Sequence, residues 1–164
     1  MEIKVLKKSF TKNILEKIIE IDKTFYSDFD FNDTSWYFER YNNKNVVYVL
    51  DVDGEIVGYF NLISISKKLF DDICKLKYSQ DYSFPKSEVN VDSDYFYMPS
   101  LLVKEEYRKY SMPLILKLKK VVENSKNFVV IAISKEGKIL SEMCLEKLGT
   151  KGKATIFTKR QEEK

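Results

Sequence analysis

A short basic turn between an apolar run and an amphipathic segment is the part of the sequence best suited to chemistry. The apolar run covers Phe96 to Val103, and the turn that follows carries Arg108 and Lys109. Ser111 is predicted to cap a helix that begins there, with Pro113 in its first turn. A strand that turns into a helix presents unpaired backbone N–H groups and the positive end of the helix dipole. With two cations beside them, these groups favour binding of a phosphate.

Charged residues are spread unevenly along the chain. Residues 1–70 hold 10 Lys/Arg and 11 Asp/Glu, residues 71–106 hold 4 and 8, and residues 107–164 hold 14 and 6. A basic C-terminal part suits a polyanionic cofactor or nucleic acid, and an acidic middle suits a cationic substrate. Solvated surfaces explain the same counts, and the basic turn, without any ligand. Because the sequence contains no nucleic-acid-binding motif, we expect no nucleic-acid partner.

The absence of histidine limits the chemistry open to the chain. Without it, the Ser/His and Cys/His pairs of nucleophilic enzymes and the histidine-bearing metal sites are excluded. Cys74 and Cys144 are isolated in the sequence, so we expect neither a disulfide framework nor a metal site. Carboxylates, tyrosines, lysines and backbone dipoles remain as the groups for catalysis.

Length and composition indicate one folded domain. The 164 residues are 44% hydrophobic and 14% aromatic, which is enough apolar surface to build a core. We therefore expect a single domain over residues 1–160 and a frayed tail at 161–164. No apolar run approaches the roughly 18 residues needed to cross a bilayer, so we expect no membrane partner and a cytoplasmic location.

Periodicity and turn residues predict the elements that position the basic turn. Asp53-Gly54 is a strong signal for a two-residue hairpin. Pro99 fits a strand that leaves regular pairing, although an edge strand would explain it equally well. Residues 135–137 are predicted to form a turn, Gly149 to stop a helix, and the polar loop 79–94 to border the substrate opening. Strands are predicted at 3–6, 46–52, 55–66, 96–103, 128–134 and 154–158, and helices at 12–25, 34–42, 67–78, 112–124 and 139–148.

The segment from Tyr97 to Lys109 resembles the fourth strand and following loop of the GNAT superfamily of N-acetyltransferases. In that family an apolar strand runs into a turn of the form Arg/Gln-x-x-Gly-x-Gly/Ala. Arg108 matches the first position, while Ser111 and Pro113 replace the two small residues. Pro113 also removes one N–H donor. The hairpin sequence DGEIVGYFNLI resembles the family's second and third strands, and the order of elements is similar over nearly the whole chain.

The resemblance implies a fold, a co-substrate and a reaction. The fold is a GNAT-like mixed α/β fold of three layers, with a twisted, mostly antiparallel sheet of about six to seven strands flanked by helices. The reaction is transfer of an acetyl or other acyl group from acetyl-CoA to an amine by direct attack. In the family the strand's backbone binds the pantetheine arm and the turn binds the pyrophosphate. The implied cofactor-binding residues are Leu101, Leu102, Val103, Arg108, Lys109, Tyr110, Ser111, Met112, Pro113 and Lys138.

The resemblance also points to catalytic and acceptor-binding residues. Tyr97 stands near the position where some relatives carry a general-base glutamate, although a core tyrosine would explain it equally well. Backbone N–H groups near Leu101 to Val103 are the candidate donors to the oxyanion. The family's region over the substrate cleft corresponds here to an aromatic and acidic stretch, which suits a small-molecule amine or a basic peptide. Its candidate substrate residues are Phe25, Tyr26, Asp28 and Trp36.

One departure from the family supports a different function. The stretch from Ser141 to Gly149 resembles the family's closing helix, but Leu145 occupies the place of its frequent tyrosine and cannot donate a proton. Together with Ser111 and Pro113, this favours a catalytically silent GNAT-like domain that binds a ligand or a protein partner. Both hypotheses are compatible with a monomer or a homodimer.

Overall fold

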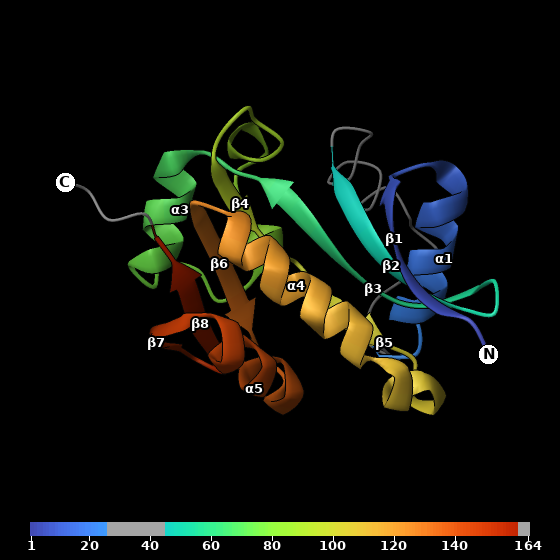
Figure 1. The fold of residues 1–164 in the computed structure, drawn as a ribbon. Coiled ribbons are helices and arrows are strands. Elements are labelled where there is room, and N and C mark those ends of the chain that lie inside the picture. Colours follow the sequence, from blue (N-terminus) through green and yellow to red (C-terminus); the bar gives the residue numbers. More distant parts are fainter. Residues whose placement is uncertain (26–44, 161–164) are drawn as a thin grey trace. The chain divides into compact units, whose positions relative to one another are not determined.

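In a computed structural model of the chain, residues 1–25 and 45–160 are described. The predicted helix at 34–42 and the predicted frayed tail at 161–164 lie outside the described residues. The chain forms two compact units, coloured along the sequence in Figure 1. The first unit comprises residues 1–61 and 100–117, and the second comprises residues 62–99 and 118–164.

The first unit is a small sheet whose strands follow the order β1, β2, β3, β5. Helix α1 packs its isoleucine-rich face into the core, and the Thr11 hydroxyl accepts a hydrogen bond from the N–H of Ile14 at 3.3 Å, as predicted for an N-cap. The elements are β1 Ile3–Ser9, α1 Lys12–Asp22, β2 Val46–Val52, β3 Glu55–Ser64 as far as Asn61, β5 Leu101–Val103, the 3-10 helix η3 Glu105–Tyr110, and the start of α4 Met112–Asn124.

The hairpin between β2 and β3 has the predicted turn. Asp53 has φ 52° and Gly54 has φ 89°, the two positive values of a type I′ turn. The carboxylate of Asp51 accepts a hydrogen bond from the N–H of Gly54 at 2.8 Å. This turn fixes the register that places the alternating residues of β3 on their two faces.

The second unit holds the end of β3 and four further strands, in the order β3, β4, β6, β8, β7. The pair β4–β6 is parallel, whereas β3–β4, β6–β8 and β7–β8 are antiparallel. The elements are α3 Lys67–Cys74, the 3-10 helices η1 Asp81–Ser83 and η2 Lys86–Glu88, β4 Tyr95–Tyr97, the end of α4, β6 Asn127–Ala132, α5 Lys135–Cys144, β7 Glu146–Lys151 and β8 Ala154–Lys159.

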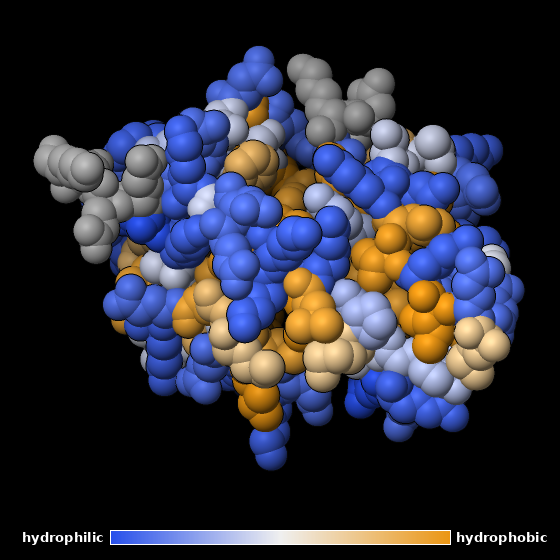
Figure 2. Space-filling model, viewed as in Figure 1, coloured by the Kyte–Doolittle hydropathy of each residue, from blue (hydrophilic) through white to orange (hydrophobic). Residues whose placement is uncertain are grey.

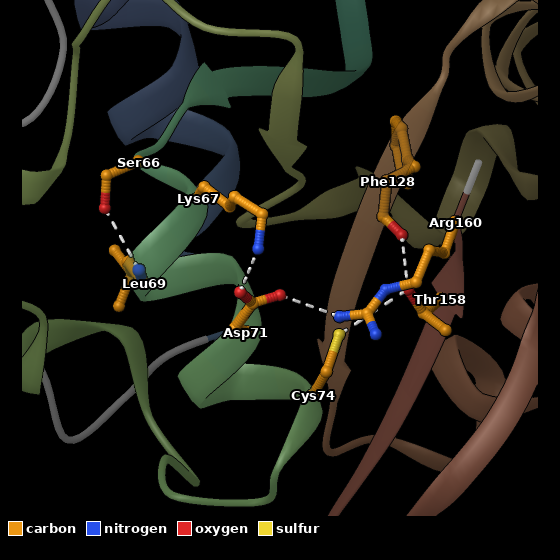
Figure 3. A network of polar contacts seen from close by, with 8 residues as sticks. All are labelled: Ser66, Lys67, Leu69, Asp71, Cys74, Phe128, Thr158 and Arg160. Atoms are coloured by element: carbon orange, nitrogen blue, oxygen red, sulfur yellow. Dashed lines mark hydrogen bonds and ion pairs between the residues drawn. The ribbon is translucent and has the colours of Figure 1, made fainter. Parts of the chain in front are cut away.

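A polar network joins α3 to the strands of the second unit (Figure 3). Asp71 accepts from Arg160 Nη2 at 2.9 Å and from Lys67 Nζ at 2.7 Å. Cys74 Sγ lies 3.8 Å from Thr158 Oγ1, whose hydroxyl donates to the carbonyl of Phe128. Burial raises the pKa of the Cys74 thiol, so this cysteine has little thiolate character at neutral pH. The network holds the helix on the sheet and offers no nucleophile.

The fold class predicted from the sequence is confirmed: the chain is a mixed α/β protein with a mostly antiparallel sheet flanked by helices. The described residues form eight strands rather than six or seven. One reason is that the predicted strand at 96–103 is divided into β4 and β5, with Met98, Pro99 and Ser100 outside both. The prediction that Pro99 marks a departure from regular pairing is therefore confirmed.

The second reason is a wrong prediction near the C-terminus. Residues 135–137 are the first turn of α5, capped by Ser134, and not a separate turn. The helix ends at Cys144, and Gly149 lies inside strand β7 instead of stopping a helix. Strand β7 pairs only with β8 and is almost entirely exposed, so its sequence lacks the apolar alternation that indicates a strand. The turn at Gly152, with φ 60°, was the available signal for this hairpin.

The surface visible in Figure 2 is mostly hydrophilic, with apolar side chains exposed among charged ones. Such exposure is ordinary for single residues on a folded domain. Among the described residues, no helix has the length and apolar character required to traverse a bilayer.

Gly58 allows β5 to approach β3 closely. It pairs with Val103, and a Cβ at this position would lie 2.9 Å from the carbonyl oxygen of Leu102 and 2.9 Å from Val103 Cγ2. Real Cβ atoms do not tolerate contacts this short, so either the side chain or the backbone of β5 would have to move. Glycine at this position is therefore a requirement of strand packing.

We expect Gly58→Ala to lower the free energy of unfolding by about 1–3 kcal/mol, because overpacking against a backbone oxygen cannot be relieved by a rotamer change. Urea denaturation measures the difference. Gly149→Ala is the matched control: it also lies in a strand, and its Cβ would meet only the end of the flexible Leu76 side chain, which can move aside. A Gly58→Ala protein as stable as the wild type would contradict the assignment.

Candidate functional site

Strand β5 has one open edge. Its only pairing partner among the described residues is β3, and the N–H of Lys104 donates to the carbonyl of Val57 at 2.8 Å. Because N–H groups point alternately to the two edges of a strand, those of Leu101 and Val103 point away from β3. No described residue accepts a hydrogen bond from either of them. This edge can pair with an extended amide-bearing ligand as a further strand would.

The pairing of β3 breaks where this edge begins. The last β3–β5 pair joins Phe60 to Leu101, and the β3–β4 pairing starts at Ile63 and Tyr97. Two residues of β3 separate these pairs, whereas three residues separate Tyr97 from Leu101, so one residue is extra. Such an insertion stops regular pairing, and bulges of this kind are frequent beside active sites.

The start of α4 offers fewer backbone donors than the sequence predicts. Ser111 directly precedes α4, the position predicted for the N-cap, but it has helical angles (φ −74°, ψ −17°), and no described N–H donates to its hydroxyl. Its carbonyl accepts from the N–H groups of Leu114 and Ile115, at 3.0 and 3.1 Å, while Pro113 has no N–H. The N–H of Met112 is the one donor of this first turn without an acceptor among the described residues. The physical reason is that η3 runs directly into α4: the Arg108 carbonyl accepts from the N–H of Ser111, and the Ser111 carbonyl accepts from that of Leu114.

Two cations stand next to this helix start. Arg108 and Lys109 are exposed, and neither forms an ion pair with a described carboxylate. The guanidinium carbon of Arg108 lies 5.7 Å from the ring centroid of Phe25, and Lys109 Nζ lies 5.1 Å from that of Tyr110. These ring contacts orient the cations without neutralising them. The structure thus brings together Arg108 and Phe25, predicted as cofactor and substrate residues respectively.

The opposite side of η3 is tied down by acidic residues. The hydroxyl of Tyr107 donates to Glu55 at 3.2 Å, and this hydrogen bond, together with the negative charge of Glu55, raises the pKa of Tyr107. Lys104 Nζ lies 3.5 Å from Glu20 and 3.7 Å from Glu55. These contacts hold the turn on β3 and α1, and within the described ranges Arg108 and Lys109 are the cations of the turn that form no ion pair.

Three buried polar residues of the first unit were missed by the sequence analysis. The Tyr59 hydroxyl donates to the carboxylate of Asp22 at 2.5 Å, with both residues buried. Asn61 lies two residues further along β3, and neither atom of its side-chain amide has a hydrogen-bond partner in the described part of the chain. The signal that could have found them is an asparagine in the otherwise apolar run GYFNLI.

Tyr97, the predicted catalytic residue, lies in the second unit. Its side chain is 2% exposed, and its hydroxyl donates to Asp81 at 3.2 Å. Its ring packs edge-on against Phe84, 5.0 Å between centroids. Asp81 and Phe84 belong to the predicted loop at 79–94, which contains η1 and η2. The loop therefore supplies the carboxylate that fixes the Tyr97 hydroxyl.

The remaining predicted residues divide into two groups. In the second unit, Lys138 Nζ donates to the carbonyl of Lys153 at 2.8 Å, and Leu145 is the half-buried residue that ends α5. Tyr26, Asp28 and Trp36 lie outside the described residues. Within the described ranges, no group of three or more acidic, histidine or cysteine side chains is placed to bind a metal.

Comparisons with known proteins identify the fold. Neither protein-family models nor curated protein sequences match the chain. Many solved structures do, among them the PaiA N-acetyltransferase from Thermoplasma acidophilum in complex with coenzyme A, at 13% identity and a TM-score of 0.56 over 98% of this chain and 99% of that one. A GNAT-family acetyltransferase from Staphylococcus aureus matches at 14% identity and a TM-score of 0.60, over 97% of this chain and 100% of that one.

A third match is NAA60 from Arabidopsis thaliana in complex with acetyl-CoA. It is 18% identical, with a TM-score of 0.60 over 94% of this chain and 98% of that one. Identities this low support the fold alone. The chain has the fold of the GNAT N-acetyltransferases, which confirms the resemblance seen in the sequence.

We expect Tyr59→Phe to lower the free energy of unfolding by about 1–3 kcal/mol, because it removes a buried donor to the Asp22 carboxylate. Tyr107→Phe is the matched control, since it removes an exposed hydroxyl–carboxylate bond and should change stability much less. Chemical denaturation of both variants measures the difference. Equal effects of the two substitutions would contradict a buried, stabilising Asp22–Tyr59 bond.

Proposed function

Starting from the GNAT fold, we propose that the protein transfers an acetyl group from acetyl-CoA to an amine. The observation that carries the proposal is the edge of β5 that no described strand pairs, followed directly by two cations of η3 that form no ion pair with a described carboxylate. A pantetheine arm carries amides that can pair with a strand edge, and the phosphates of coenzyme A attract cations. The β5 edge precedes the cations along the chain, just as the pantetheine arm precedes the phosphates along coenzyme A when it is followed from the thiol end.

The residues of the first unit fit acetyl-CoA in part. The N–H groups of Leu101 and Val103 would hold pantetheine and the thioester oxygen, which suits them as donors to the developing oxyanion. The phosphates would be held by Arg108, Lys109 and the N–H of Met112. Because Pro113 and Leu114 supply no free donor, side-chain cations would contribute more of the phosphate binding here than helix N–H groups do.

The reaction requires few groups from the protein. The acceptor nitrogen forms a bond to the thioester carbonyl carbon, the carbon–sulfur bond breaks, and the amine proton is lost as the coenzyme A thiolate gains one. Acetyl-CoA supplies the activated acyl group, and the protein supplies positioning and proton transfer. Tyr97 is the candidate proton-transfer residue, since its hydroxyl is fixed on Asp81. We propose a small-molecule amine or a basic peptide as the acceptor, bound in part by the Phe25 ring.

A second candidate function is binding of a ligand or protein partner without catalysis. It is favoured by Leu145, which has no proton to donate, and by the engaged donors at the start of α4. Retention of acetyl-CoA binding without turnover would support it.

We expect acetyl-CoA at about 100 times its dissociation constant to raise the melting temperature by roughly 5–10 °C. A ligand that binds only the folded state stabilises it by an amount that grows with the logarithm of ligand concentration over dissociation constant. Desulfo-CoA should give a similar shift, and ATP a much smaller one. The double variant Arg108→Ala/Lys109→Ala should weaken binding at least about tenfold, because charge-assisted contacts to phosphate are lost. Differential scanning fluorimetry over a range of acetyl-CoA concentrations measures both effects.

Lys7→Ala/Lys8→Ala is the matched control, because it also removes two adjacent exposed cations from the first unit. It should bind acetyl-CoA like the wild type. If millimolar acetyl-CoA gives no shift, the proposed function is wrong. If the two double variants lose affinity equally, the basic turn does not hold the phosphates.

We expect Tyr97→Phe to lower kcat by about 10²–10⁴-fold, the usual contribution of a positioned proton-transfer group. Stability should change by only about 1 kcal/mol, because a single hydrogen bond to Asp81 is lost. Release of the coenzyme A thiol measures the rate once an acceptor has been found among amines. Tyr95→Phe, two residues earlier on β4, is the control and should keep full activity. Full activity of Tyr97→Phe would assign Tyr97 to the core.

A further inference from the structure

Asn61 is a buried polar residue without a partner. Its side chain is 1% exposed, and neither Oδ1 nor Nδ2 has a hydrogen-bond partner in the described part of the chain. Natural proteins rarely bury an amide in this way, because the group loses its bonds to water and gains none in return. Asn127, also buried, follows the usual rule, since its Nδ2 donates to the Asp94 carbonyl at 3.3 Å. An orphaned amide at a functional position indicates a ligand.

Asn61 lies where the open edge of β5 begins. It is the first residue of β3 beyond the last β3–β5 pair, which joins Phe60 to Leu101. Since residues alternate along a strand, Asn61 lies on the same face of β3 as Tyr59, whose hydroxyl reaches Asp22 of α1. Tyr59 is tied to α1, and Asn61 is not tied to anything described. Its amide therefore has unused hydrogen-bonding capacity next to the Phe60–Leu101 pair, where β5 begins.

The chemistry of an asparagine side chain narrows the ligand. Oδ1 accepts hydrogen bonds and Nδ2 donates them, side by side in one plane. An ammonium alone would satisfy Oδ1 and leave Nδ2 unpaired, and a carboxylate would do the reverse. A carboxamide or peptide amide presents a donor next to an acceptor and satisfies both atoms.

We propose, resting on the proposed acetyl transfer, that Asn61 binds an amide group of a substrate. Two sources carry this chemistry: an acceptor with an amide close to its amine, as in a peptide or an amino-acid amide, and the pantetheine arm of acetyl-CoA. The acceptor is the favoured source, because the N–H groups of Leu101 and Val103 already offer pairing to pantetheine. Asn61 is thus a specificity residue that separates amide-bearing amines from simple alkyl amines.

The first test is the stability of the free protein. Asn61→Leu keeps the branched shape and the number of side-chain heavy atoms and removes the orphaned amide, so its melting temperature should rise by about 2–6 °C. Asn61→Val, which is less bulky, should also raise it and controls for overpacking. Asn127→Leu is the matched control and should lower the melting temperature, because it removes a partnered amide. If Asn61→Leu lowers the melting temperature as Asn127→Leu does, the amide of Asn61 is satisfied within the protein and the proposal is overturned.

The second test compares acceptors that differ only in the amide. Tyrosinamide with tyramine, and lysinamide with cadaverine, are such pairs. We expect Asn61→Leu to reduce the ratio of kcat/KM for amide over plain amine at least tenfold, with the KM for acetyl-CoA unchanged. Intrinsic differences in amine reactivity cancel in this comparison. Weaker acetyl-CoA binding with an unchanged ratio would assign the amide to pantetheine, and no change in either quantity would overturn the proposal.

A third measurement separates this proposal from the proposed function. The side-chain NH₂ resonances of Asn61, identified by their loss in Asn61→Leu, are followed by ¹⁵N NMR during titration of the wild type. We expect them to shift with tyrosinamide and not with tyramine, whether or not thiol is released. Absence of thiol release with this selective shift would remove the transferase function and leave the amide site. Equal shifts with both compounds, or none with tyrosinamide and acetyl-CoA, would overturn the amide site.

Discussion

The close packing of β5 on β3 is the constraint on which the candidate site depends. Gly58 lets the backbone of β5 come within van der Waals distance, and the pairing at Gly58, Tyr59 and Phe60 holds three residues of β5 in register. Because every second N–H of β5 is used on that side, the others must point to the free edge. The donors proposed for pantetheine and for the oxyanion are therefore fixed by a backbone contact, and they need no side chain of their own.

In the proposed phosphate site, the cations of the turn after β5 would compensate for the missing helix N–H donors. A helix that binds phosphate through its N-terminus needs free N–H groups, but η3 continues into α4, the Ser111 carbonyl accepts from the N–H of Leu114, and Pro113 has no N–H. Among the described residues, Arg108 and Lys109 form no ion pair, whereas Glu20 and Glu55 are engaged by Lys104 and Tyr107. Binding by exposed cations is more sensitive to salt than binding by backbone dipoles, so phosphate affinity at this site should fall steeply with ionic strength.

The sequence predicted those features that have a local cause. The Asp53-Gly54 turn, the Thr11 cap and the break at Pro99 each follow from the conformational preferences of a few neighbouring residues, and each is confirmed. Strand β7 could not be predicted in this way, because an exposed edge strand owes its conformation to its partner β8 and carries no apolar pattern. The same holds for the site: the basic turn is visible in the sequence, whereas the Asp22–Tyr59 bond joins residues 37 positions apart. The engaged donors of α4 were missed because they depend on how η3 ends.

Tyr59 and Asn61 occupy the same face of β3, but among the described residues only the Tyr59 side chain has a hydrogen-bond partner for its buried polar group. The Tyr59 hydroxyl donates to the Asp22 carboxylate of α1. This hydrogen bond stabilises the fold and uses the hydroxyl proton within the protein. The Asn61 amide is buried at similar depth without such a match in the described part of the chain, which should cost stability in the free protein. Under the proposal, a ligand that supplies the missing bonds would offset that cost. The position of this asparagine in the otherwise apolar run GYFNLI, beside the break where β5 begins, fits the proposed recognition of an amide.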